Sequence, residues 1–109
     1  MTYNQLKSRK AIMPKTYLIG HLAVSDAATY KAYSTAVPDI VKSHGGQYLV
    51  RGGQSRNVEG TTGGDRHVVM VFPDRQAAED FYSSAAYQAI LPIRLKSSKG
   101  SILLVDGLD

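Results

Sequence analysis

One short stretch of the chain carries several side chains that could do chemistry. Within residues 43–53, an imidazole (His44), a phenol (Tyr48) and a guanidinium (Arg51) lie close together in the sequence. An imidazole can act as an acid or a base near neutral pH. A guanidinium can hold a carboxylate through two hydrogen bonds, and a phenol can donate a hydrogen bond to a carbonyl or enolate oxygen. These residue types favour a site for a small molecule.

Other tyrosines could join this site from the helices that the sequence predicts. The residues that we expect to bind a ligand are Tyr33, His44, Tyr48, Arg51, Tyr82 and Tyr87, and the candidates for catalysis among them are His44, Arg51 and Tyr33. A structural interpretation stays open, because tyrosines at helical spacing commonly belong to a core with a hydrogen-bonded tip, and His44 would then cap the end of a helix. No recognisable catalytic motif links these residues, so the sequence assigns no activity.

Hydrophobic periodicity predicts the first elements that must position these side chains. Residues 16–24 are apolar at nearly every position and predict a strand. Residues 27–43 carry an apolar stripe at helical spacing, and Asp26 (or the serine before it) is a suitable N-cap for that helix. Pro38 lies inside the helix, where we expect it to cause a kink or to begin a second segment.

Paired glycines bracket the strand that follows. Gly45 or Gly46 can take the positive φ that ends a helix, and the pair at 52–53 can supply a bulge just past the strand over residues 47–51. Strict alternation along this strand would place Tyr48 and Arg51 on opposite faces.

The second half of the chain repeats the pattern of strands and helices. We expect residues 54–59 to continue the strand, 60–65 to form a turn and 66–72 to form a buried strand. We expect residues 75–83 to form a helix, 85–96 to form a helical piece that is broken at Pro92, and 101–106 to form the last strand. The resulting order predicts an α+β fold of the ferredoxin-like βαββαβ class, with a four-stranded antiparallel sheet and helices on one face.

The predicted strands are apolar on both faces. In a sheet with one face in water, apolar and polar side chains should instead alternate along each strand. In residues 66–72, for example, Val68 and Met70 point one way, while Val69 and Val71 point the other. Left bare, the second face would expose on the order of 600 Å², at the limit of what a soluble monomer tolerates. We therefore expect a homodimer in which the sheets pack face to face as a dimeric α/β barrel.

Composition narrows the class of protein. The chain has 109 residues, no cysteine and a net charge of +4, so we expect one domain without disulfides or thiolate metal sites, in the cytoplasm. Lys7, Arg9 and Lys10 account for most of this net charge. We therefore expect an arm over residues 1–13, which is either disordered or an extension, followed by one domain over residues 14–109. We expect the protein to bind neither nucleic acid nor a membrane, and to use no cofactor. The alternative, that the basic arm binds nucleic acid, predicts binding that weakens as salt is added.

Two histidines and three arginines have structural interpretations. His21 and His67 lie in strands predicted to be neighbours, and without a nearby carboxylate they are only a weak signal for a metal site. We expect them to be hydrogen-bonded histidines at the sheet face. Arg56, Arg66 and Arg94 are expected in solvent or in surface ion pairs.

Residues 14–108 resemble a known family, the small proteins called domain of unknown function thirteen-thirty. The resemblance rests on the opening strand, Asp26, Tyr30, Tyr33, Pro38, the run from His44 to Gly46, and the run from Tyr48 to Gly53. It implies a ferredoxin-like subunit of the dimeric α/β-barrel class, which includes cofactor-free monooxygenases, small isomerases and haem-handling enzymes. Two functions stay open: a module that binds a small molecule between sheet and helices, and a cofactor-independent enzyme of the monooxygenase or isomerase type that uses His44 and Arg51.

Overall fold

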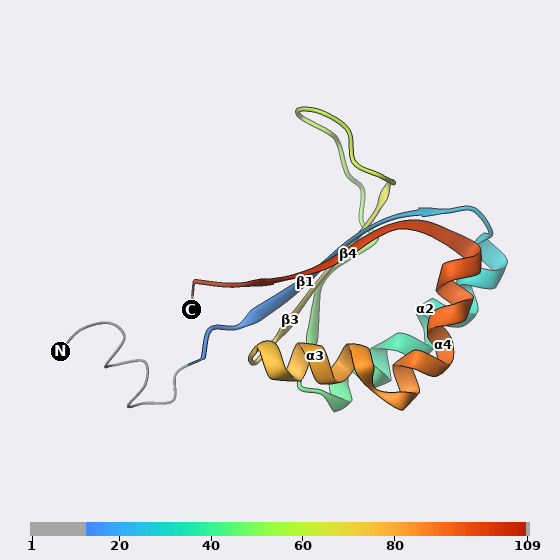
Figure 1. Ribbon diagram of the computed structural model, residues 1–109. Helices are drawn as coiled ribbons and strands as arrows, with labels where there is room; N and C mark the ends of the chain where they lie inside the picture. Colours follow the sequence, from blue (N-terminus) through green and yellow to red (C-terminus); the bar gives the residue numbers. More distant parts are fainter. Residues whose placement is uncertain (1–12, 109) are drawn as a thin grey trace.

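In the part of the chain that the structure describes, the fold consists of one antiparallel sheet and three helices. A computed structural model describes residues 13–108, so the predicted arm lies outside the described residues except for Met13. The elements are β1 (Thr16–Val24), α2 (Ala27–Ser43), β2 (Gln47–Arg51), β3 (Arg66–Phe72), α3 (Arg75–Ser83), α4 (Ala85–Ser97) and β4 (Ser98–Asp106). The strands lie in the order β2-β3-β1-β4, and the helices all cover the same face (Figure 1). The predicted ferredoxin-like fold is confirmed.

Polar side chains start each helix. Asp26 accepts a hydrogen bond from the Thr29 N–H (3.1 Å), Asp74 accepts one from the Ala77 N–H (2.8 Å), and Ser84 separates α3 from α4. Hydrogen bonds from the Thr29 side chain and backbone also hold the pKa of Asp26 below its ordinary value. These caps satisfy N–H groups that lack partners inside the helix, which fixes where the helices begin beside the sheet.

Three predicted elements differ from the structure. α4 continues through Pro92 without a break, because α4 packs along α2, and this packing outweighs the one hydrogen bond that the proline removes. β4 begins at Ser98, directly after α4, and pairs with β1 along its whole length. The predicted strand continuation over residues 54–59 is wrong: that segment is exposed and carries no strand.

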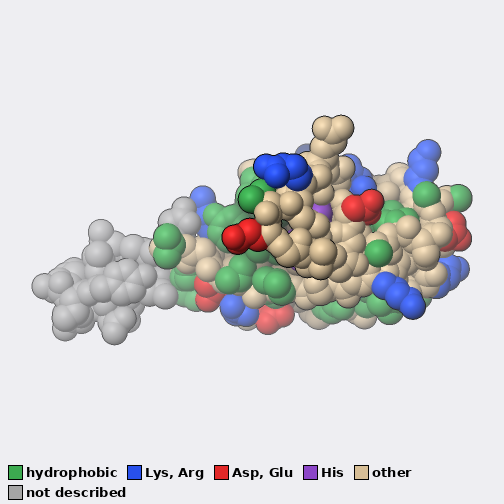
Figure 2. Space-filling view, turned by 90° about the horizontal axis from the view of Figure 1, so that it is seen from above, with side chains coloured by type: hydrophobic (Ala, Val, Ile, Leu, Met, Phe, Trp, Pro, Cys, Tyr) green, Lys and Arg blue, Asp and Glu red, His purple; other side chains and the backbone are tan. Residues whose placement is uncertain are grey.

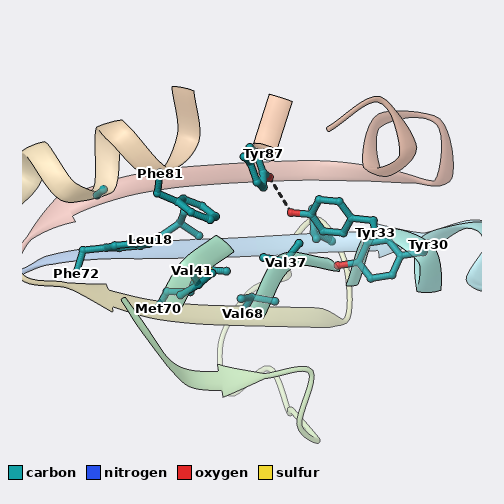
Figure 3. Close-up of a cluster of buried hydrophobic side chains, with 12 residues drawn as sticks. Leu18, Tyr30, Tyr33, Val37, Val41, Val68, Met70, Phe72, Phe81 and Tyr87 are labelled. Carbon is teal, nitrogen blue, oxygen red and sulfur yellow. Dashed lines mark hydrogen bonds between the residues drawn. The ribbon is translucent and has the colours of Figure 1, made fainter. Parts of the chain in front are cut away.

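The core lies between the helices and one face of the sheet (Figure 3). Phe72 from β3 and Phe81 from α3 are almost fully buried, with ring centroids 5.2 Å apart. The buried apolar residues of this layer are Leu18, Leu22, Tyr30, Tyr33, Val37, Val41, Val68, Met70, Phe72, Ala78, Phe81 and Tyr87. Three of these twelve are tyrosines, so hydroxyl groups must find partners inside the core.

A β-bulge in β2 changes which side chains face the helices. Tyr48 lies opposite Met70 and Val50 lies opposite Val69, so Leu49 is the extra residue between them. Because the bulge shifts the alternation by one position, Arg51 lies opposite the buried Val68, on the same face as Tyr48. The prediction that Tyr48 and Arg51 face opposite ways is therefore wrong.

Within residues 13–108, no helix lies over the other face of the sheet. Val50, Leu103 and Val105 expose 41%, 45% and 42% of their surface there, and hydrophobic side chains gather over one half of this side of the molecule (Figure 2). We call this surface the open face. None of the described helices is long and apolar enough to cross a membrane.

Candidate functional site

A narrow cleft lies between α2 and the covered face of the sheet, and four of the six predicted ligand-binding residues line it: Tyr33, Tyr48, Arg51 and Tyr87. The remaining lining residues are Leu18, Leu22, Tyr30, Ser34, Arg66, Val68, Met70, Phe81 and Ile102. The cavity measures about 20 Å³, which is room for one water molecule. In this form the cleft is closed to anything larger.

A pair of phenols forms the buried wall of the cleft. The hydroxyls of Tyr33 and Tyr87 lie 2.7 Å apart and share a hydrogen bond (Figure 3). Burial raises the pKa of Tyr33 well above its ordinary value, because the phenolate would lose its hydration. Both side chains therefore offer hydroxyl hydrogen bonds, and Tyr33 in particular stays neutral at physiological pH.

Tyr48 and Arg51 form one side of the cleft mouth as a consequence of the bulge. The Arg51 guanidinium lies 5.1 Å from the centre of the Tyr48 ring, a cation–π contact, and its Nη2 donates to the Ser34 carbonyl (2.6 Å). Burial raises the pKa of Tyr48 to about 12, although the Arg51 charge acts in the opposite direction. Arg51 thus closes the mouth by bridging β2 to α2.

Arg66 forms the other side of the mouth, where the expectation of a solvated arginine is wrong. Its Nε donates to the Tyr30 hydroxyl (3.1 Å), and its guanidinium lies 5.1 Å from the centre of the Tyr30 ring. Gly52 makes room for this side chain, because a Cβ there would lie 2.5 Å from the Arg66 Nη1. The alternation of Arg66 with Val68 and Met70 was the sequence signal for this placement.

The expectation that Arg94 lies in solvent or in a surface ion pair is also wrong, because only 6% of its surface is exposed. Its Nε has no hydrogen-bond partner. Burial lowers the pKa of Arg94, but the neighbouring Tyr87 and Tyr33 hydroxyls outweigh that effect and raise it. Arg94, on α4, therefore lies next to the phenol pair. The signal was its spacing of two helical turns from Tyr87, which puts both on one face of α4.

The structure does not bring His44 or Tyr82 into the cleft. His44 caps α2, and its Nδ1–H donates to the Ile40 carbonyl (2.9 Å), since a carbonyl can only accept. Its ring packs against the edge of Phe81, with centroids 6.0 Å apart. Tyr82 stacks on the outer side of Tyr87 and lines a separate surface groove. The geometry of His44 matches the capping interpretation.

His21 and His67 form a pair on the open face. They lie opposite each other in β1 and β3, and their Nδ1 atoms share a hydrogen bond of 2.9 Å. The prediction of hydrogen-bonded histidines at the sheet face is therefore confirmed, and the structure adds that each is the other's partner. Among residues 13–108 no three potential metal-ligating side chains gather in one place.

Solved structures of other proteins share this fold. A protein of unknown function from Rhodopseudomonas palustris matches with a TM-score of 0.74 and 13% identity, over 100% of this chain and 95% of that one. The cofactor-independent oxygenase SnoaB from Streptomyces nogalater matches with a TM-score of 0.60 and 10% identity, over 88% and 95%. A dabb family protein with a ferredoxin-like fold from Mesorhizobium loti matches with a TM-score of 0.55 and 14% identity, over 89% and 98%. At these identities the likeness concerns the fold.

Sequence comparison gives the family. No curated protein matches the chain. The sequence profile of the family described as "Domain of unknown function (DUF1330)" matches residues 15–108, which is nearly the whole chain. The chain belongs to the DUF1330 family.

Proposed function

We propose that the chain works as a homodimer and that each subunit binds a small organic molecule in the cleft between α2 and the sheet. The observation that carries the proposal is the convergence of Tyr33, Tyr87, Arg51 and Arg66 on one largely apolar cleft. An apolar pocket with a few convergent polar groups is the usual form of a small-molecule site.

The cleft must open before it can bind a molecule larger than water. Arg51 is exposed and bridges the mouth through its hydrogen bond to the Ser34 carbonyl. Swinging this side chain outward breaks that bond and leaves the guanidinium in water, at a net cost of about 0.5–3 kcal/mol. Binding of a ligand that fills the cleft can supply this much free energy.

The homodimer is supported by the open face. Its exposed Val50, Leu103 and Val105 lie beside half-buried Ile19 and Val69. Covering on the order of 600 Å² on each of two chains gives roughly 1,200 Å² in total, the lower end of the range for stable interfaces. A second sheet of the same twist is a matching cover.

A second candidate function is a cofactor-independent oxygenase or isomerase that acts in the same cleft. It is supported by the fold likeness to SnoaB, a cofactor-independent oxygenase, and by neutral phenols that could stabilise an enolate oxygen. His44 would take no part, because it caps α2 outside the cleft. Turnover of a bound ligand by the wild-type protein would favour this enzyme over a binding module.

Native mass spectrometry on gently purified protein tests both parts of the proposal. We expect a dimer that carries extra non-covalent mass. Ser34→Phe, at the mouth, should lose that mass, whereas Thr35→Phe, an exposed neighbour on α2, should keep it. For the dimer, Leu103→Glu should give monomers, and Leu95→Glu, exposed on α4, should not. A wild-type monomer, or bound mass that survives Ser34→Phe, would contradict the corresponding part.

A further inference from the structure

The mouth of the cleft holds two positive charges with neutral partners. Arg51 donates to a backbone carbonyl and Arg66 donates to a phenol. Within residues 13–108, neither makes an ion pair with an acidic side chain, and no Asp or Glu lines the cleft. Guanidinium groups bind carboxylates and other oxyanions more strongly than they bind neutral acceptors. Both arginines therefore retain donors for an anion.

The buried wall of the cleft offers a donor as well. The hydroxyls of Tyr33 and Tyr87 have two protons, and their mutual hydrogen bond uses one of them. One phenol proton is left over, so the pair presents a hydrogen-bond donor to a ligand.

The surfaces between these polar groups are flat or apolar. Tyr30 and Tyr48 present rings that already stack against the guanidinium groups, and Val68, Met70 and Ile102 form the floor. Such walls suit a planar conjugated group, since aromatic rings gain from offset or edge contacts beyond the burial of area.

We propose that the ligand is a planar conjugated anion with a second, neutral acceptor oxygen. Its carboxylate or enolate binds Arg51 and Arg66, which exchange the Ser34 carbonyl and the Tyr30 hydroxyl for the charged oxygens. Its neutral oxygen accepts from the Tyr33–Tyr87 pair. This inference rests on the proposed function of the cleft, and it adds the chemical class of ligand.

Three matched probes test the two contacts. 4-Acetylbenzoate carries both oxygens, 4-acetylbenzamide removes the charge, and 4-isopropylbenzoate replaces the ketone oxygen by a methyl group of similar shape. Methyl-¹³C labelling of the three methionines gives a local readout, because Met70 lines the cleft and Met13 lies at the exposed start of the described chain. Titration of the full chain then measures the affinity and the place of binding together.

We expect 4-acetylbenzoate to shift the Met70 signal and to bind about tenfold or more tightly than the amide, as charge-assisted hydrogen bonds do. Its advantage over 4-isopropylbenzoate should be about threefold to tenfold, the size of a neutral hydrogen bond. Arg51→Met/Arg66→Met should abolish the preference for the anion, whereas Arg56→Met, in the exposed loop, should keep it. Tyr33→Phe/Tyr87→Phe should abolish the preference for the ketone, whereas Tyr17→Phe, on the open face, should keep it.

Two results would overturn the inference in different ways. If the amide and the isopropyl compound shift Met70 as strongly as the ketoacid does, the assigned class of ligand is wrong and the cleft still binds small molecules. If no probe, charged or neutral, shifts Met70 at millimolar concentration, both this inference and the proposed function fail. Unchanged thermal unfolding of the labelled variants, checked beside each titration, ensures that a lost preference reflects recognition and not unfolding.

Discussion

The two faces of one sheet, built from alternate residues of the same strands, have different compositions. On the covered face, Leu18 and Val68 meet helices that bring hydroxyl and guanidinium groups into the core. On the open face, Ile19, Val69 and Leu103 form an apolar surface that also carries the pair of histidines. Covering by helices lets this fold enclose specific polar groups, whereas the face left without helices offers area for another flat surface.

The largest expected effect comes from breaking the covered face. Phe81 is fully buried and contacts the rings of Phe72 and Tyr87, so Phe81→Ala should lower the free energy of unfolding by about 3–5 kcal/mol. Urea unfolding measures this loss. Leu103→Ala on the open face is the matched control, and in dilute protein it should lose far less. Equal losses would mean that the two faces contribute alike to the stability of the subunit.

A smaller effect should follow from a change at the cleft mouth. Gly52 has φ +70°, and an added Cβ would collide with the Arg66 guanidinium. Gly52→Ala should therefore lower the free energy of unfolding by about 1–2 kcal/mol from backbone strain, and it should displace Arg66 from Tyr30. Gly53→Ala has open space around its Cβ and should be nearly neutral. Comparable effects at both positions would contradict the tight packing of Arg66 beside Gly52.

Two phenols of the covered face, the buried Tyr33 and the half-buried Tyr48, should make stability fall at alkaline pH, and Tyr48 is the one whose share can be followed through its pKa. The pKa of Tyr48 rises to about 12 in the fold, from 10 in the unfolded chain. Because the native state then binds more protons, its stability is complete below pH 10 and falls as pH rises from 10 through 12. Denaturant titrations between pH 8 and pH 11.5 should show this decline, and Tyr48→Phe should reduce its slope. A slope that Tyr48→Phe leaves unchanged would assign the decline to other groups.

Much of the fold could be predicted because local periodicity and burial agree. The limits of β1, β2 and β3 match the predicted ranges, since runs of apolar residues end there at glycines or at capping residues. Pro92 misled the prediction of α4, because packing against α2 outweighs the loss of one hydrogen bond. Tertiary contacts of that kind leave no local signal.

The candidate site was harder to predict than the fold. His44 and Tyr48 are close in sequence, but the turn at Gly45 sends the chain back, so the histidine stays at the end of α2 while Tyr48 enters the cleft. The bulge at Leu49 gave no signal beyond the nearby glycines, and it alone brings Arg51 to the correct face. Arg66 and Arg94 could have been found from strand alternation and helical spacing.

The same bulge limits how other chains can add to the sheet. β2 is an edge strand of five residues, and a straight edge strand offers its free N–H and C=O groups as a template on which further strands can grow into aggregates. An extra residue at Leu49 bends this edge and breaks the regular spacing that such a template needs. Uncontrolled edge-to-edge growth is therefore disfavoured at β2, although its partner β3 is rich in β-branched residues.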